Sequence, residues 1–196
     1  MPDSLHPLLQ ELLNNNDFLT TVLATVIAVP VLLFLFRTRL KNWRQERNIR
    51  KAIRRLGVRS MENIHLPDGT GGEVMIEHLL LGRDAIIVVG VMRYEGLIFG
   101  SPHTDQWTQV INLRSYKFDN PDYYLQRQFN AVRLIAPDAR VSGWHLFGHG
   151  AQFPKDKPDN VLQPGDVRSL PKRPRRRDIP KPLRAAWKQL VDKVSD

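Results

Sequence analysis

VMIEHLLLGRDAIIVVGVM, residues 74–92, is the stretch that decides the fold. It contains two apolar runs, Val74 to Leu81 and Ala85 to Met92, and the linker Gly82-Arg83-Asp84 joins them. Apolar, β-branched runs of this length are typical of strands, and a short linker that contains glycine is typical of a tight antiparallel turn. The stretch therefore predicts a β-hairpin.

The segments on both sides extend this hairpin into an α+β domain. Glycine and proline residues divide the chain into short apolar runs, which is the pattern of strands joined by turns. After Asn120-Pro121 the apolar residues recur at helical spacing. Three or four antiparallel strands, a helix and further strand make an α+β layout. The expected strands are residues 60–66, 97–99, 107–113, 141–147 and 161–167, and the expected helix is 122–134.

Residues 18–36 (FLTTVLATVIAVPVLLFLF) form an uncharged run. As a helix this run would be about 28 Å long, close to the ~30 Å hydrocarbon core of a bilayer. A cleaved signal peptide requires a basic start, whereas residues 1–36 contain no Lys or Arg. A buried core helix would show a wider polar face than the three threonines of this run provide. We therefore expect one transmembrane helix at 18–36.

The distribution of charge predicts the orientation of that helix and the kind of partner. All 29 Lys and Arg residues follow the span, so the positive-inside rule places residues 37–196 in the cytoplasm and residues 1–17 outside an inner (cytoplasmic) membrane. Beyond residue 36 those 29 bases face 17 acids, a formal net charge of +12, which favours nucleic acid or anionic lipid headgroups as partners. The chain has no cysteine, which excludes disulfides, thiolate zinc sites and cysteine nucleophiles.

Two segments concentrate the basic residues. We expect a juxtamembrane helix at 37–57 that ends at Gly57, a proline-rich basic linker at 169–181, and an amphipathic helix at 182–196. The terminal helix is expected to pack against the domain, and the basic segments are expected to contact nucleic acid or lipid. The basic residues concerned are Arg37, Arg39, Lys41 and Arg44 in the first segment and Lys172, Arg173, Arg175, Arg176 and Arg177 in the second.

Several short motifs follow one another in order between residues 45 and 150. They are Ile76-Glu77-His78, then Tyr94, Gly96, Ile98 and Gly100, then Trp107, Asn120-Pro121 and Gln126. In this order they resemble the nuclease-related domain (NERD) family, whose members are similar to restriction-endonuclease-like nucleases with a PD-(D/E)xK motif. The resemblance implies a central mixed sheet flanked by helices, in a domain that covers residues 58–168.

The resemblance also implies where the chemistry of the family would lie. In such nucleases an acid on one strand faces Glu-x-Lys on the next, and the carboxylates hold Mg²⁺, which activates water. Here Glu77 matches the acid, but Gly90 and Met92 stand at the Glu and Lys positions, and neither can bind Mg²⁺ or donate a proton. Glu46 and Gln126 are candidate replacements. We expect no ordinary cleavage and no cofactor; only an active domain would require Mg²⁺, with Glu77 as its candidate ligand.

Three functions remain open at this point. The first is a membrane-anchored, cytoplasm-facing domain that binds nucleic acid or a protein partner without cutting. The second is an active metal-dependent nuclease with a rearranged site built from Glu46, Glu77 and Gln126. The third is a membrane-associated assembly or lipid-binding module without enzymatic activity. The first fits the loss of the Glu-x-Lys pair best, because a scaffold and a basic surface remain when the metal ligands are gone.

Overall fold

A computed structural model describes residues 16–155, 157–170 and 173–195. The chain divides into two compact units, Met1–Arg44 and Gln45–Asp196, and helix α2 (Asn16–Leu56) contributes to both. In the part of the chain that the structure describes, α2 is the one helix long and apolar enough to cross a membrane. None of the residues in its apolar segment is buried. The helix ends one residue before Gly57, as expected from the sequence.

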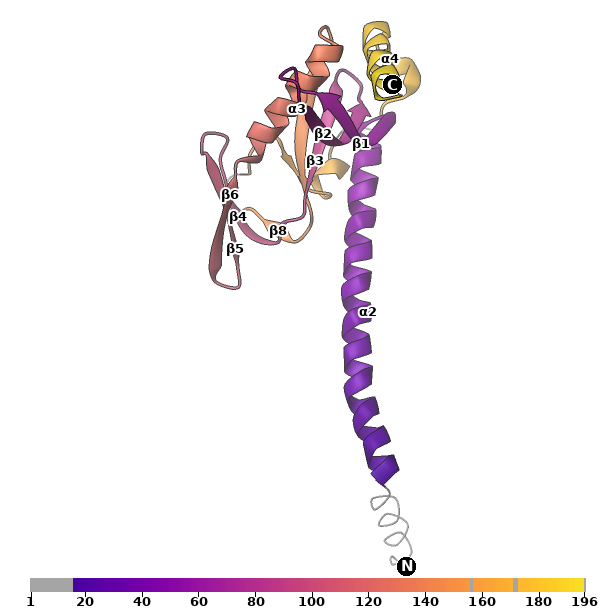
Figure 1. Ribbon diagram of the computed structural model, residues 1–196, viewed down its shortest axis with the longest axis vertical. Coiled ribbons are helices and arrows are strands. Elements are labelled where there is room, and N and C mark those ends of the chain that lie inside the picture. Colours follow the sequence, from indigo (N-terminus) through magenta and orange to yellow (C-terminus); the bar gives the residue numbers. More distant parts are fainter. Residues whose placement is uncertain (1–15, 156, 171–172, 196) are drawn as a thin grey trace, which may run out of the picture. The chain divides into compact units, whose positions relative to one another are not determined.

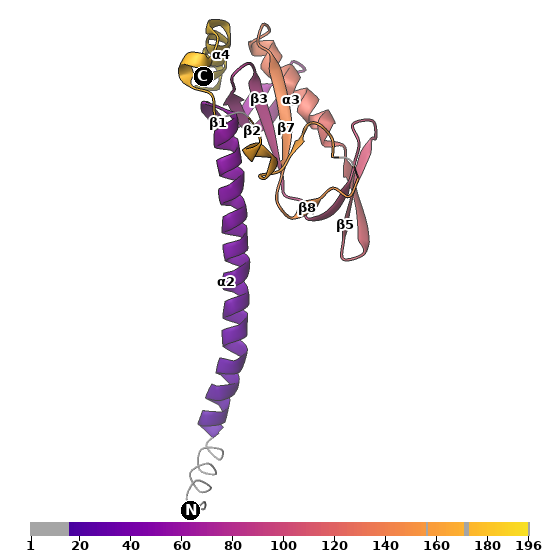
Figure 2. The same cartoon turned by 180° about the vertical axis from the view of Figure 1, so that it is seen from behind.

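The main sheet of the second unit has five strands in the order β1-β2-β3-β7-β9. Strands β1, β2, β3 and β7 of this sheet are labelled in Figure 2, and the first three also in Figure 1. Strands β1, β2 and β3 are antiparallel neighbours, whereas β7 lies parallel to β3 and β9 lies parallel to β7. The predicted hairpin is therefore confirmed, and it occupies the middle of a mixed sheet. The strands are β1 (Arg59–Pro67), β2 (Glu73–Leu81), β3 (Ile86–Met92), β7 (Val141–Phe147) and β9 (Val161–Leu162).

The remaining strands form a second sheet, in the order β6-β5-β4-β8. The expected central mixed sheet flanked by helices is present, but residues 97–99 and 107–113, expected to continue the same meander, belong to this second sheet. Gly96 redirects the chain with a φ of +84°, and a Cβ atom there would lie 2.3 Å from the Val110 carbonyl oxygen. The strands are β4 (Gly96–Phe99), β5 (Gln106–Ile111), β6 (Arg114–Asp119) and β8 (Ala151–Gln152).

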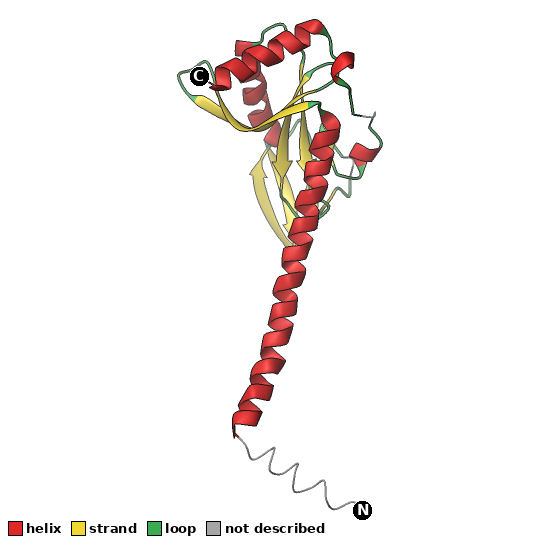
Figure 3. Ribbon diagram, turned by 90° about the vertical axis from the view of Figure 1, so that its right-hand side faces the viewer, coloured by secondary structure: helices red, strands yellow, loops and turns green. Residues whose placement is uncertain are grey.

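Helices cover both faces of the main sheet (Figures 1 and 3). Helix α3 (Pro121–Ile135) and helix α4 (Lys181–Ser195) share one apolar cluster with β1, β2 and β3. The last turns of α2 form another cluster with β3, β7 and β9 through Ile49, Ala52 and Ile53. Helix α4 buries one apolar stripe in the first cluster, so the expected packing of the terminal helix is confirmed.

Two local irregularities distinguish the observed fold from a regular pattern. The expected strand at 161–167 is reduced to β9, and a short 3-10 helix, η1 (Asp166–Arg168), follows it; a second, η2 (Arg176–Asp178), precedes α4. In β2 the alternation of faces slips, because Ile76 and Leu79 are three residues apart yet lie in the same apolar cluster. Asn63 on β1, with a φ of 53°, lies next to the slip. Glu77 lies within the slipped segment.

Candidate functional site

Glu77 lies where the pairing of β2 with β3 stops. The last backbone pair is His78 with Val89. Beyond it, the Val91 N–H donates to Glu77 Oε2 at 2.9 Å. The carboxylate thus replaces the backbone carbonyl that a longer β2 ladder would supply, and one of its oxygens is used to satisfy a largely buried backbone group.

Arg93 joins Glu77 to the acid on α2. Its Nη1 donates to Glu77 Oε1 at 3.0 Å, and its Nε donates to Glu46 Oε1 at 3.4 Å. The three side chains are 55%, 25% and 43% exposed for Arg93, Glu77 and Glu46. Partial burial works against the charged guanidinium, but hydrogen bonds and charges from both glutamates outweigh it and raise the pKa of Arg93. We call Glu46, Glu77 and Arg93 the acid–arginine cluster.

The sequence interpretation had paired Glu46 with Glu77 but had missed Arg93. The sequence does single out Arg93, because it follows Met92 directly and is the only Lys or Arg between residues 84 and 113. A long side chain at the end of β3 can turn back over the place where the lysine of the family motif would point. Gln126 is exposed on α3 and forms no hydrogen bond to either glutamate among the described residues.

Gly90 and Met92 lie beside a buried histidine on β7. A Cβ atom on Gly90 would be 3.5 Å from Met92 Cε and 3.9 Å from His145 Nδ1. His145 is 1% exposed, and its Nε2 lies 2.7 Å from Asp122 Oδ1. Burial lowers the pKa of His145, although the hydrogen bond and charge of Asp122 oppose this shift. The position of the family's second carboxylate is therefore Gly90, and a buried imidazole packs beside it on β7.

These residues do not match the ligand set of a divalent cation. Both oxygens of Glu77 already accept hydrogen bonds, one from Val91 and one from Arg93. At the positions where the family has a carboxylate ligand and a lysine, this chain has Gly90 and Met92. Among the described residues, no three His, Asp or Glu side chains are grouped to hold a metal ion.

Other residues of the sequence motif build the fold. A Cβ atom on Gly100 would lie 2.1 Å from the ring of Trp107, which is fully buried and donates its Nε1 hydrogen to the Ser101 carbonyl at 3.1 Å. Asn120 caps α3 by accepting a hydrogen bond from the backbone of Asp122 at 3.0 Å, and its amide donates to the Thr104 carbonyl at 2.8 Å. These motif residues fix the junction between the second sheet and α3.

The basic residues predicted from the sequence lie in different settings. Arg173 donates to the Gly57 and Val58 carbonyls at 3.0 and 3.1 Å, so it anchors the linker to the end of α2. Arg175, Arg176 and Arg177 are exposed, and Lys172 lies outside the described residues. Arg37, Arg39, Lys41 and Arg44 are exposed on the part of α2 that belongs to the first unit.

A groove beside α4 gathers basic side chains that the sequence alone had not grouped. Its volume is about 250 Å³, and no acidic residue is among the described residues that line it. Trp187, which is 4% exposed, lies on its apolar side. We call it the α4 basic groove; its basic residues are Arg59, Arg176, Arg184 and Lys188.

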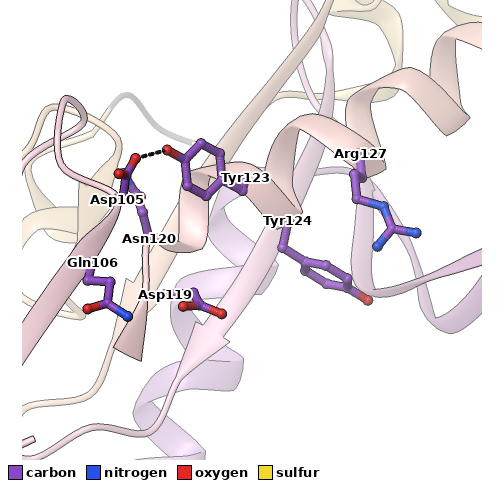
Figure 4. Close-up of a pocket in the computed structure, with 7 residues that line it drawn as sticks. All are labelled: Asp105, Gln106, Asp119, Asn120, Tyr123, Tyr124 and Arg127. Carbon is purple, nitrogen blue, oxygen red and sulfur yellow. Dashed lines mark hydrogen bonds between the residues drawn. The ribbon is translucent and has the colours of Figure 1, made fainter. Parts of the chain in front are cut away.

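A larger open pocket of about 760 Å³ lies where the second sheet meets the start of α3 (Figure 4). Tyr123 donates its hydroxyl hydrogen to Asp105 Oδ1 at 2.6 Å, and this bond together with the carboxylate charge raises the pKa of Tyr123. Tyr124 donates instead to the Met75 carbonyl at 2.8 Å. Both hydroxyls are thus oriented by the fold, and the raised pKa of Tyr123 is the opposite of what an activated phenolate nucleophile requires.

Comparison with known proteins agrees with the resemblance read from the sequence. Residues 41–148, more than half of the chain, match the family model described as a nuclease-related domain. An uncharacterized protein of Bacillus anthracis is 26% identical over 93 residues, which cover 46% of this chain and 44% of that protein. The chain therefore spans less than half the length of this relative. No solved structure matches.

Proposed function

Because the chain belongs to the nuclease-related domain family, we propose that its second unit is a nuclease-like domain that binds nucleic acid without cutting it. Helix α2 anchors this domain in a membrane. The acid–arginine cluster carries the proposal, since a guanidinium lies between the two carboxylates that a catalytic metal would have to share.

Electrostatics explains why this arrangement disfavours a catalytic metal. Two unit charges about 4 Å apart near a protein surface interact by ~4 kcal/mol, and a divalent cation beside Arg93 would be repelled about twice as strongly. Each Glu77 oxygen also already uses one of its two lone pairs to accept a hydrogen bond, from Val91 or from Arg93, so fewer sites are left for a metal. Arg93 therefore supplies the positive charge that the family's metal would bring, but it cannot generate a hydroxide nucleophile.

The α4 basic groove supports nucleic acid as the partner. Its four basic side chains surround an opening lined by no acid among the described residues. Arginine and lysine in such a groove contact phosphates regardless of sequence, and each phosphate contact releases counterions. We therefore expect binding to DNA or RNA that weakens steeply with salt and shows little preference for sequence.

A cleavage and binding assay tests this function. The full chain in an uncharged detergent is incubated with Mg²⁺ or Mn²⁺ and labelled single- and double-stranded DNA and RNA, beside Glu77→Gln and the matched control Glu73→Gln on the same strand. We expect binding without cleavage. Metal-dependent cleavage that is lost in Glu77→Gln and kept in Glu73→Gln would establish the rearranged nuclease instead.

The binding measurements distinguish nucleic acid from lipid as the partner of the basic surface. Arg176→Gln combined with Arg184→Gln should weaken nucleic-acid binding and reduce the salt slope by about two. Arg114→Gln combined with Lys117→Gln removes the same charge from the exposed strand β6. This control variant should change neither the affinity for nucleic acid nor the salt slope. Binding to anionic vesicles with no nucleic-acid binding would favour the lipid-binding module.

The proposed topology can be tested because the chain has no cysteine. We propose that residues 18–36 span the inner membrane, with residues 1–17 outside and the domain in the cytoplasm. In intact cells a membrane-impermeant maleimide should label Ser4→Cys, and it should label Asp159→Cys only after permeabilisation. The reverse pattern would contradict the orientation, and release of the protein by alkaline carbonate would contradict the span.

A further inference from the structure

A second basic pocket lies at the other end of β3 from the acid–arginine cluster. Its volume is about 380 Å³, within the range of small-molecule sites. The residues that matter for its chemistry come from the end of α2, the β2–β3 turn and the start of β7. We call it the Trp144 pocket; these residues are Arg55, Arg83, Asp84, Arg140, Ser142 and Trp144.

Strand pairing brings two of these arginines together from distant parts of the sequence. The parallel pairing of β3 with β7 begins at Ile86 and Val141, and the Ile86 N–H donates to the Arg140 carbonyl at 2.8 Å. Arg83 lies in the turn just before Ile86, and Arg140 lies just before Val141. Both arginines therefore lie at the same end of the two paired strands.

An aromatic side chain and a third arginine complete the pocket. Ser142 and Trp144 are two residues apart on β7, so they lie on the same face of the sheet, toward the end of α2. Trp144 is half-buried and packs against the apolar cluster on that face. Arg55 Nη2 donates to the Leu170 carbonyl at 3.5 Å, which holds this guanidinium at the rim.

The charges at the pocket are unbalanced. Three guanidinium groups face one carboxylate, Asp84. Arg83 and Arg140 are exposed, and neither side chain forms a hydrogen bond or ion pair with another described residue. Their donors are therefore available to an anion, and arginine binds phosphate through paired hydrogen bonds. The indole beside them offers a flat surface for an aromatic ring.

We propose that the Trp144 pocket binds a nucleotide, with its base against Trp144 and its phosphate against Arg83 and Arg140. A free nucleotide and the phosphorylated end of a strand share this chemistry. The proposal deepens the proposed nucleic-acid binding and rests on it where the ligand is a strand, but it does not depend on the acid–arginine cluster or on the α4 basic groove.

Calorimetric titration of the full chain in uncharged detergent tests the pocket. The probes are adenosine monophosphate, adenosine, ribose 5-phosphate, and an oligoadenylate with and without a 5′-phosphate. We expect saturable binding of the monophosphate, about tenfold or more weaker binding when either the base or the phosphate is missing, and tighter binding of the phosphorylated oligonucleotide if strand ends are the ligand.

Two variants and one control assign the binding to the pocket. Arg83→Gln combined with Arg140→Gln should weaken monophosphate binding at least tenfold, and Trp144→Leu should weaken it roughly five- to a hundredfold. Arg114→Gln combined with Lys117→Gln removes the same charge elsewhere and should have no effect. Because Arg83 and Arg140 are exposed, that variant should fold even if Trp144→Leu does not, and thermal unfolding checks both.

Three results would overturn the proposal: no measurable binding of adenosine monophosphate, binding of the monophosphate no tighter than that of ribose 5-phosphate, or unchanged monophosphate affinity in the variant that combines Arg83→Gln with Arg140→Gln. If long strands still bound in a salt-dependent way, the proposed function would stand while the nucleotide pocket failed. Monophosphate binding without binding of long strands would support the pocket for free nucleotides and contradict the broader function.

Discussion

Replacing Glu77 by alanine and by glutamine should separate the two contacts of its carboxylate. Alanine removes the acceptor for the Val91 N–H, which lies on a residue that is only 7% exposed, and it also removes the partner of Arg93. An unsatisfied buried N–H costs about 1–3 kcal/mol. The partly exposed ion pair adds ~0.2–1 kcal/mol after solvent screening. We therefore expect Glu77→Ala to lower the free energy of unfolding by about 2–3 kcal/mol.

Glutamine keeps an oxygen that can accept from Val91 and loses the charge and the second oxygen that accepts from Arg93. Glu77→Gln should therefore cost less than about 1 kcal/mol. For a domain of this size, 1 kcal/mol shifts the melting temperature by ~2–4 °C, so we expect a fall of roughly 4–12 °C for alanine and at most about 4 °C for glutamine.

Thermal and urea unfolding of the full chain in detergent, followed by circular dichroism, measures the difference. Glu73→Ala, at the exposed start of the same strand, is the matched control. If glutamine were as destabilising as alanine, the charge pairing with Arg93 would be the dominant contact. If alanine cost less than ~0.5 kcal/mol, replacement of a ladder carbonyl by the Glu77 carboxylate would contribute nothing measurable to stability.

Three further predictions follow from the same region. Arg93→Gln leaves Glu46 and Glu77 without their shared cation, so Mn²⁺ should stabilise this variant more than the parent chain, by about 1.4 kcal/mol at tenfold excess over its dissociation constant; equal thermal shifts in both proteins would contradict this. Gly100→Ala forces a Cβ atom into the buried ring beside it and should cost ~1–3 kcal/mol in urea unfolding. Burial lowers the pKa of His145 below 6.5, so the unfolded chain binds this proton more readily, and the associated stability is present above about pH 6.5 and lost as the pH falls below it. The melting temperature should fall between about pH 7 and pH 5, and less so in His145→Gln.

The sequence predicted the elements that have a strong apolar pattern. The hairpin, β7, α3 and α4 all carry such a pattern, and their observed bounds lie within one or two residues of those expected. Strand β6 was missed because its side chains are nearly all exposed, so no alternation marks it. The division into two sheets was missed because it depends on the turn at Gly96 and on the choice of β7 as the neighbour of β3, and neither leaves a periodic signal.

The candidate site was predicted only in part for a similar reason. Motif spacing located Glu77 and showed that Gly90 and Met92 cannot serve a metal. It could not locate Arg93, because contact between Arg93 and Glu46 joins residues 47 positions apart through the packing of α2 on the sheet. The arginines of the Trp144 pocket were equally hidden, since Arg83 and Arg140 become neighbours only through parallel strand pairing.

Charge along the α2 face of the sheet indicates where a nucleic acid would bind. The acid–arginine cluster carries two carboxylates and one guanidinium, so it repels a phosphate, whereas the Trp144 pocket carries three guanidiniums and one carboxylate. Glu46 and Arg55 are nine residues apart on one helix, or about 14 Å. In a metal-loaded nuclease the cation would reverse the repulsion and draw the phosphate to the carboxylates. With Arg93 in that place the reversal is incomplete, so the proposed function predicts that a bound strand is held away from Glu46 and Glu77, and that the same three side chains explain binding without cleavage.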